Sequence, residues 1–536
     1  MTSLRAPIGA AAVILAAASM GTASADELTI GLAAEPSAMD PHYHNLGPNN
    51  AMRTHIFEAL IEQDAEQKLE PYLAESWRPL DDTTWEFKLR EGVRFHDGTE
   101  LDAQDVIYTM CRVPLVADSP SSFTIYTKAV AAMEAPDPQT VIIKTDGPYP
   151  LLPTELASIG IISAPADATG ITFSRDGCDG IGETPTTAEF NSGEKAAGTG
   201  PYKLVQYTPG DRIVLERNDD YWGREQHWEK VTFRPITSDG PRVAALLAGD
   251  VDLIERPSIQ DLERIKSEGF EVAQGLSNRV IYLHVDHEQE PSPGVSGTDG
   301  KNPFKDIRVR EAISKAINRE AIVDRIMGGV AVPAGELLPG GMFGSRPDAK
   351  ADSYDPERAK ELLTEAGYPD GFGLVIGTPN DRYINDAKIA QAVAQMLARI
   401  GIETEVDAMT ATTFFSRRNN YEFSTYLAGW GSGTGEMSSP LIALVATPDS
   451  AKGMGGTNRG QYSNPELDAL IEQALGTVDD AEREKLLQQA SQVVIEDYGI
   501  LPLHFEVTPW AYREGLTYEP RTDQATLAMS VEPASS

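Results

Sequence analysis

Residues 85–110, WEFKLREGVRFHDGTELDAQDVIYTM, constrain the fold of this chain more than any other stretch. Apolar Trp85, Phe87 and Leu89 alternate with polar side chains, and this period of two predicts a β-strand with one buried and one solvated face. Asp97-Gly98 supplies turn chemistry. Asp102 is suited to accept backbone N–H bonds at the start of a helix. The stretch therefore predicts a strand, a turn and a capped helix.

The length of the chain predicts more than one lobe. It has 536 residues, of which 41% are apolar. A single hydrophobic core rarely serves more than about 300 residues, so two or more lobes are expected. The apolar content is sufficient to build them.

Helix signals dominate the second half. Asp355-Pro356 and Asn464-Pro465 each pair an N-cap residue with a proline at the first helical position. In residues 385–400, apolar side chains recur at helical spacing and predict a core-facing helix followed by a strand at residues 403–406. After about residue 285, helices alternate with single strands, which predicts an α/β lobe.

Two elements are predicted in the first half. Residues 52–63, MRTHIFEALIEQ, predict a helix. Residues 198–223, GTGPYKLVQYTPGDRIVLERNDDYWG, predict a β-hairpin, because alternating strands flank Pro209-Gly210, which suits the central positions of a type II turn.

The stretch at 85–110, the preceding LEPYLAESW and the hairpin together resemble the family-5 extracellular solute-binding proteins, the capture subunits of bacterial peptide and nickel importers. The resemblance implies an α/β, two-lobed periplasmic-binding-protein fold of type II, in the large peptide-binding subclass. It implies a division of the chain into a signal peptide, two lobes and an inserted subdomain. The expected ranges are 1–25 for the signal peptide, 26–62, 195–278 and 505–536 for lobe I, 63–194 for the inserted subdomain of lobe I, and 279–504 for lobe II.

The N-terminus predicts secretion. Arg5 is the only charged residue before Asp26, and an apolar run at residues 8–20 precedes Ala23-Ser24-Ala25, a small-x-small cleavage pattern. The run is shorter than the about 20 residues that a membrane-spanning helix needs. A lipoprotein would need a cysteine at the cleavage point, but the first cysteine is Cys111. We therefore expect a periplasmic protein that is not embedded in the membrane.

Charge excludes some partners. The formal net charge is −36 at pH 7, so nucleic acid and anionic lipid surfaces are unfavourable partners. An acidic, well-solvated surface is the simplest interpretation, and we expect a monomer.

The two cysteines of an exported chain favour one disulfide, Cys111–Cys178, which would tie a long excursion to the inserted subdomain. A catalytic thiol is disfavoured because neither cysteine has a neighbouring histidine in the sequence.

No catalytic or metal signature stands out. The eight histidines are scattered and no His-Glu-x-x-His occurs. His284 and His287 are three apart on a predicted strand, so they should point to opposite faces. We therefore expect no metal, no cofactor and no enzymatic activity, although an exported hydrolase remains an alternative that would explain the signal and the size.

Residues 429–435, GWGSGTG, predict a binding loop. They lack the glycine two positions before Ser432 that a nucleophile elbow requires, and their glycines do not have the dinucleotide-binding spacing. The preceding strand runs into a flexible loop that exposes its backbone. We expect Trp430 to stack on a ligand and Gly431 and Ser432 to form hydrogen bonds with it.

The resemblance also implies a recognition site for a charged ligand. Dipeptide-binding members carry Gly-Trp followed, three residues beyond the tryptophan, by an aspartate that pairs with the α-ammonium of the peptide. Here Gly433 stands at that position, and the next acidic residue is Glu436. Either Glu436 replaces the aspartate from another angle, or the ligand has no free α-amine at that point.

Peptide-binding members also have an arginine and a nearby tyrosine just before the long helix of lobe II, and Arg382 and Tyr383 occupy this place. The planar guanidinium binds a carboxylate or phosphate with two hydrogen bonds, although a capping or ion-pairing role at the helix entry is equally compatible. Tyr43 and His44 are further candidates on the rim of lobe I.

Together these features predict the periplasmic substrate-binding component of an ABC import system. It would capture a short peptide or similar small polar solute and deliver it to an inner-membrane permease with its ATPase subunits. An opine, a sugar derivative or a metal chelate is an alternative ligand, because such a scaffold serves many solutes. A chemoreceptor is a further compatible partner.

Overall fold

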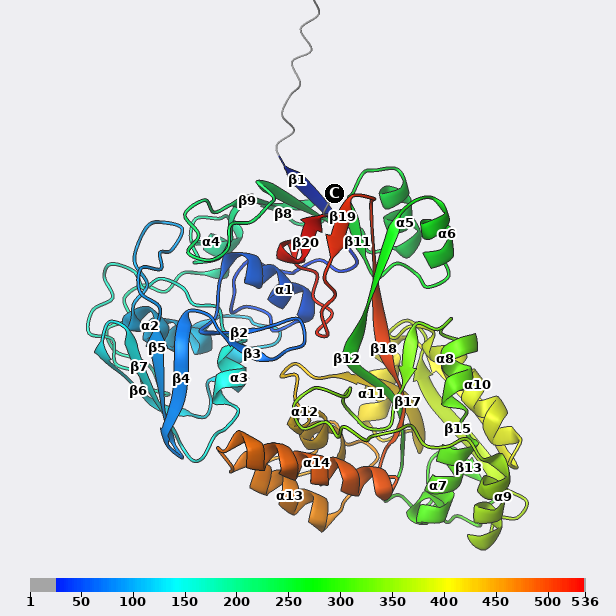
Figure 1. Cartoon of the computed structure of the whole chain (residues 1–536). Coiled ribbons are helices and arrows are strands. Elements are labelled where there is room, and N and C mark those ends of the chain that lie inside the picture. The colour runs from blue at the N-terminus through cyan, green and yellow to red at the C-terminus, as the bar shows by residue number, and fades with distance from the viewer. Residues whose placement is uncertain (1–25, 535–536) are drawn as a thin grey trace, which may run out of the picture.

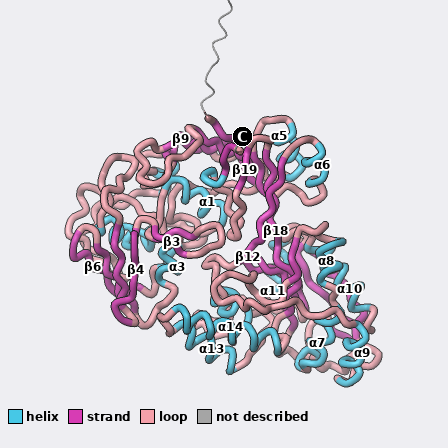
Figure 2. The backbone as a smooth tube through the Cα atoms, viewed as in Figure 1, coloured by secondary structure: helices cyan, strands magenta, loops and turns pink. Residues whose placement is uncertain are grey.

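The computed structural model describes residues 26–534, and the expected signal peptide lies outside the described residues. Figure 1 shows two bodies, one at the top and left and one at the lower right, joined by the long strands β12 (Glu271–Val285) and β18 (Leu501–Tyr512). We call the first body lobe I and the second lobe II. Figure 2 shows strands concentrated along this connection and helices around lobe II.

One twelve-stranded sheet continues through both lobes, with strand order β13-β15-β17-β12-β18-β11-β1-β10-β9-β8, while β14 pairs with β18 and β16 with β15. The strands of lobe I are β1 (Glu27–Leu32), β8 (Tyr202–Thr208), β9 (Arg212–Arg217), β10 (Lys230–Pro235) and β11 (Leu253–Glu255). The strands of lobe II are β13 (Val295–Ser296), β14 (Ala331–Pro333), β15 (Phe372–Pro379), β16 (Ile402–Met409) and β17 (Thr425–Gly431).

The shared strands are irregular where they pass between the lobes. β12 and β18 pair antiparallel, but their register shifts between Leu276 and Val280 and again between Ile281 and Tyr282. Such bulges bend a strand and redirect its side chains. The first shift brackets residues 277–279, which consequently lie at the junction of the lobes.

A separate four-stranded sheet lies beside lobe I at the left of Figure 1, with order β4-β5-β7-β6. Its strands are β4 (Ala74–Asp81), β5 (Thr84–Leu89), β6 (Val130–Asp137) and β7 (Thr140–Thr145). Two short hairpins complete the strands: β2 (Ile61–Gln63) with β3 (Leu69–Pro71), and β19 (Leu516–Tyr518) with β20 (Val531–Pro533).

The strand and the capped helix predicted for residues 85–110 fold as expected. Trp85, Phe87 and Leu89 of β5 are buried, whereas the residues between them are partly exposed. Asp102 forms a reciprocal capping box at the start of α2 (Ala103–Arg112). Cys111, in the last turn of this helix, is joined to Cys178 by a disulfide, as expected.

Besides α2, the helices of lobe I are α1 (Gly47–Ile56), α3 (Leu152–Leu156), α4 (Thr187–Asn191), α5 (Asp239–Leu247) and α6 (Leu262–Ser267). Those of lobe II are α7 (Ile307–Ala316), α8 (Arg319–Arg325), α9 (Pro356–Glu365), α10 (Asp386–Ala398), α11 (Ala411–Asn419), α12 (Ser438–Pro440), α13 (Pro465–Leu475) and α14 (Asp480–Glu496). No helix within residues 26–534 is long and apolar enough to cross a bilayer.

The capping signals of lobe II are confirmed. Asp355 and Asn464 accept backbone N–H bonds at the starts of α9 and α13. Ile389, Val393 and Leu397 of α10 are fully buried in the lobe II core, as their spacing predicts.

The predicted helix at residues 52–63 is wrong at both ends. α1 begins at Gly47, with Pro48 in its first turn, and ends at Ile56. The carbonyls of residues 56, 58 and 60 accept hydrogen bonds from the N–H groups of Gly200, Ile161 and Ala74. Because these carbonyls bond to other segments, the helix cannot continue, and the chain turns into strand β2.

His504 on β18 gives the protein a testable sensitivity to acid. Its ring is fully buried, neither nitrogen has a hydrogen-bond partner, and burial lowers its pKa to about 4. The unfolded chain, with a histidine pKa of about 6.5, binds a proton there that the folded chain does not. Between pH 6.5 and 4 this histidine therefore removes about 1.4 kcal/mol of stability per pH unit as the pH falls.

We expect His504→Gln to flatten the pH dependence of stability by this amount. Urea unfolding of both proteins between pH 7.5 and 4.5 measures it. Plotted against pH, the free energies of unfolding of the parent and the variant should run parallel above pH 7 and diverge below pH 6.5. Parallel curves over the whole range would contradict the prediction.

Candidate functional site

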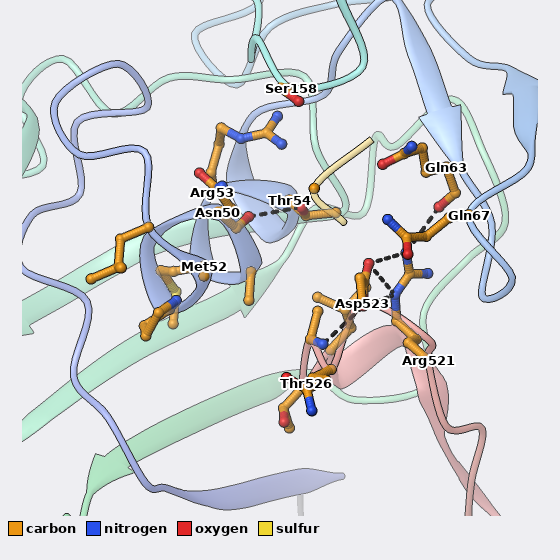
Figure 3. A pocket seen from close by; sticks show the side chains of 18 of the residues that line it. Asn50, Met52, Arg53, Thr54, Gln63, Gln67, Ser158, Arg521, Asp523 and Thr526 are labelled. Carbon is orange, nitrogen blue, oxygen red and sulfur yellow. Dashed lines mark hydrogen bonds and ion pairs between the residues drawn. The ribbon is translucent and has the colours of Figure 1, made fainter. Parts of the chain in front are cut away.

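A cavity of about 400 Å³ lies where the two lobes meet. Lobe I provides α1, the β2–β3 hairpin and the segment of residues 521–527, and lobe II provides Gly431, Ser432 and Gly433 at the end of β17. Figure 3 shows the side chains of Arg53, Gln63, Gln67, Arg521 and Asp523 around this space. Segments far apart in the sequence therefore converge on one site.

The irregular part of β12 supplies polar groups to the cavity. The Asn278 side-chain amide donates to Gln67 Oε1 and to the Ser432 carbonyl, each at 2.6 Å. Arg279 Nε lies 3.4 Å from Glu506 Oε2, and its Nη2 lies 3.3 Å from Gln524 Oε1. The irregular register thus turns two consecutive polar side chains toward residues of both lobes.

The glycine-rich loop of lobe II touches the β2–β3 hairpin of lobe I. Gln63 Nε2 donates to the Thr434 carbonyl at 3.0 Å, and Gln67 Nε2 approaches the Ser432 carbonyl at 3.4 Å. Gly435 has φ +72°, and a Cβ there would lie 2.7 Å from Gln67 Cβ, so this close approach requires glycine. The loop forms a direct contact between the lobes.

Three of the predicted ligand residues lie together at the end of β17. Tyr383 Oη donates to the Gly429 carbonyl at 3.2 Å, and the Arg382 guanidinium lies 5.4 Å from the Tyr383 ring centre. Trp430 is half-buried, and its Nε1 donates to Ser439 Oγ at 3.2 Å. Arg382 itself is exposed. The structure therefore brings Arg382, Tyr383 and Trp430 into one region of lobe II.

Ser432 and Glu436 make contacts within lobe II. Ser432 lines the cavity, but its hydroxyl donates to the Glu436 carbonyl at 3.1 Å. Both oxygens of the buried Glu436 carboxylate accept from Arg483 Nη1 at 2.9 Å, and Ser438 donates to one of them. The acidic group that follows Gly433 is thus already neutralised by an arginine of α14.

Tyr43 and His44 lie away from this cavity. Tyr43 lines a second cavity, beside Arg112 and residues 184–188, and His44 Nδ1 bonds Ser37 Oγ at 2.9 Å. The neighbouring His42 is fully buried, where its Nδ1 lies 2.9 Å from Arg112 Nη1. The structure therefore does not bring these two candidates together with the residues of β17.

Three of the acidic residues that line the cavity between the lobes are bonded by the protein itself. Glu58 accepts hydrogen bonds from Tyr221 Oη and Trp222 Nε1, and burial raises its pKa to about 7. Glu255 accepts from the Ala33 N–H and Thr526 Oγ1. Asp523 pairs with Arg521 at 2.8 Å.

Sequence reasoning missed most of the cavity. Arg53, Gln63, Gln67, Asn278, Arg279 and residues 521–527 were not among the candidates. Arg53 had one signal, a positive charge within a helical segment whose other side chains are mostly buried. Gln63 and Gln67 are brought to the cavity by the β2–β3 hairpin, Asn278 and Arg279 by the bulge of β12, and residues 521–527 by the segment between β19 and β20. No local sequence pattern indicates these placements.

Comparisons with known proteins agree with one another. The model of a family described as "Bacterial extracellular solute-binding proteins, family 5 Middle" matches residues 68–452. The glutathione-binding protein GsiB of Escherichia coli (strain K12) is 29% identical over 507 residues, which are 92% of this chain and 92% of that protein.

Solved structures show the same fold. HbpA2 from Haemophilus parasuis superposes with a TM-score of 0.79 at 23% identity, covering 95% of this chain and 100% of the other. The periplasmic binding protein DppA from Helicobacter pylori, solved with the peptide STSA, superposes with a TM-score of 0.70 at 23% identity over 95% of this chain and 98% of the other. The expected type II periplasmic-binding-protein fold is confirmed.

Proposed function

Since the chain belongs to family 5 of the bacterial extracellular solute-binding proteins, we propose that it captures a short peptide or similar small polar solute between its lobes and delivers it to an ABC permease. One observation carries this proposal. The cavity lies at the lobe junction, its lining comes from both lobes, and β12 and β18 join these lobes beside it.

Delivery depends on closure. β12 and β18 connect bodies with separate hydrophobic cores, so small backbone rotations in these strands would move one lobe against the other. A ligand drives closure only if it binds the closed form more tightly than the open form. Contacts to both lobes, such as those available from Gly431 and Asn278, would provide this difference in affinity.

The ligand class follows from the residues and from the relatives. GsiB is named for glutathione, a modified tripeptide, and DppA was solved with a tetrapeptide. We assign Trp430 to stacking, Arg382 and Tyr383 to an anionic end, and Gly431 and Ser432 to backbone hydrogen bonds. Because Glu436 is paired with Arg483 and Gly433 carries no charge, recognition of a free α-amine is assigned to neither of them.

The cellular location and the partners of the protein follow from the same proposal. A signal peptide ending at Ala25 would deliver a monomeric protein to the periplasm, where the permease and its ATPase subunits are the partners. A chemoreceptor would recognise the same closed form.

Small-angle scattering tests the proposal. We expect the radius of gyration to fall when a peptide mixture or glutathione is added, and the melting temperature to rise. Mass spectrometry of the solute that copurifies with the protein identifies the natural ligand. A rigid particle that shows no compaction, together with cleavage of the added peptides, would instead favour an exported hydrolase.

A further inference from the structure

Arg53 is a cation of the cavity without an anion. It lies in the last turn of α1 and lines the cavity. Its Nε is buried with no hydrogen-bond partner, and no carboxylate within residues 26–534 forms an ion pair with it. Burial lowers its pKa to about 10, so it remains charged at neutral pH. In Figure 3 its side chain extends from α1 toward Ser158, away from Arg521 and Asp523.

Three buried arginines of this chain have strong partners. Arg112 pairs with Asp40 at 2.7 Å, Arg483 pairs with Glu436 at 2.9 Å, and Arg242 donates to three backbone carbonyls. A guanidinium removed from water without a counter-charge costs several kcal/mol, which explains why the fold supplies these partners. Arg53 differs because it faces a space that a ligand can enter.

The Arg53 side chain is also held in place. A Cβ on Gly160 would lie 3.1 Å from Arg53 Cδ, 3.3 Å from its Cγ and 2.9 Å from Phe57 Cβ. Glycine at position 160 therefore leaves just enough room for the aliphatic stem. A stem packed in this way fixes the direction of the guanidinium before any ligand arrives, which lowers the entropy cost of binding.

Cations also gather at another part of the cavity. Arg256 and Arg279 both line it. Burial lowers the pKa of Arg279, the nearby Glu506 opposes this shift, and the charges of Arg382 and Arg256 add to it. Arg256 Nη2 lies 3.5 Å from Gln524 Oε1, and the backbone of Arg256 has φ +48°. Glu506 is the one carboxylate that pairs with this group within residues 26–534.

The cations of the cavity that lack a carboxylate partner indicate the charge of the ligand. Glu58, Glu255 and Asp523 of the lining are engaged by protein donors, and the charge of Arg521 acts on Glu62. Within residues 26–534, by contrast, neither Arg53 nor Arg256 forms an ion pair with a carboxylate. The charge of Arg382 also acts on Arg279. We propose that the solute carries two separate acidic groups, one bound by Arg53 and the other by Arg256 and Arg279 together with Arg382. This inference rests on the proposed function and specifies its substrate class as a peptide or peptide-like dicarboxylate.

Binding of defined probes tests the proposal. Glutathione and glutamate-containing dipeptides carry two carboxylates, their monoesters carry one, and succinate and glutarate are dicarboxylates without a peptide. Calorimetric titration should show at least about tenfold tighter binding of a two-carboxylate peptide than of its monoester, the range expected for a charged hydrogen bond. Equal affinities for the peptide and its monoester would overturn the proposal.

The variant Arg53→Met tests the residue. We expect its affinity for the best two-carboxylate probe to fall at least about tenfold, while Arg53→Lys, which keeps the charge but loses the planar fork, should show a smaller loss. Arg325→Met is a matched control, because Arg325 is an exposed arginine in the last turn of α8, and it should bind as the parent does. An affinity of Arg53→Met within twofold of the parent would remove Arg53 from the site.

Two further readouts separate the possible failures. The melting temperature of ligand-free Arg53→Met should equal or exceed that of the parent, because the substitution removes a charge whose buried Nε has no hydrogen-bond partner, whereas an arginine with a structural role would lower it. If dicarboxylates bind but peptides do not, the peptide assignment fails and the two-anion site stands. If neither class binds, both proposals are wrong.

Discussion

Asp40→Asn should cost about 3–5 kcal/mol of the free energy of unfolding, the usual cost of removing one partner of a buried ion pair. Arg112 and Asp40 have side chains that are 2% and 0% exposed, and two parallel hydrogen bonds of 2.7 Å join them. Thr187 Oγ1 also donates to Asp40. The variant leaves the Arg112 guanidinium buried without its counter-charge. Because the site is closed to solvent, water cannot replace the lost carboxylate.

The pH dependence of this loss has a definite sign. Burial raises the pKa of the Asp40 carboxyl, but the hydrogen bonds and charge of Arg112 outweigh burial and hold the pKa below its ordinary value. The stability that Asp40 provides is therefore complete above the unfolded pKa of about 3.9 and is lost as pH falls through the lower folded pKa. The difference between parent and variant should shrink below about pH 4.

Urea unfolding at pH 7 measures the effect. Glu134→Gln provides the control, because Glu134 and its partner Lys144 are 60% and 47% exposed, and an exposed pair contributes at most about 1 kcal/mol. A loss for Asp40→Asn no larger than that of Glu134→Gln would show that the buried pair is dispensable.

Local signals in the sequence predict much of the fold. The alternation of Trp85, Phe87 and Leu89 and the caps at Asp355 and Asn464 act over a few residues, and the structure contains the corresponding elements. The end of α1 was not predictable in this way. The end of this helix depends on Gly200, which is distant in sequence and whose N–H donates to the carbonyl of Ile56.

The cavity was predictable only in part. The pattern around Trp430 marks a binding loop, and Gly431 and Ser432 line the cavity. Asn278 and Arg279 reach it through a register shift between β12 and β18, which depends on the pairing of strands more than 200 residues apart. The isolation of Arg53 is a property of the folded surroundings, because only the structure shows which carboxylates lie within reach.

Glu436→Gln should also cost about 3–5 kcal/mol of stability but change ligand affinity less than about twofold. Glu436 and Arg483 have side chains that are 4% and 6% exposed, so the substitution removes the buried counter-charge of Arg483 and leaves it only Asp480, which is 76% exposed and lies 3.1 Å from Nη2. The sequence pattern alone suggests that Glu436 binds the ammonium of a peptide. The structure instead places its carboxylate against Arg483, so a ligand amine would have to displace Nη1, which bonds both carboxylate oxygens.

Urea unfolding and calorimetric titration with the best peptide probe, at a temperature where the variant is folded, separate these two roles. Glu472→Gln is the matched control, since Glu472 pairs with Lys452 on the surface of lobe II and both side chains are about half exposed, and it should change neither quantity. A ligand-binding Glu436 would reverse the expected result, with affinity falling more than tenfold for peptides with a free amine and stability nearly unchanged. The double variant Glu436→Gln with Arg483→Met should recover part of the lost stability, because it removes a buried charge whose remaining partner, Asp480, is exposed. The recovery should be partial, because the stacking of Arg483 on Phe343 at 4.3 Å is lost as well.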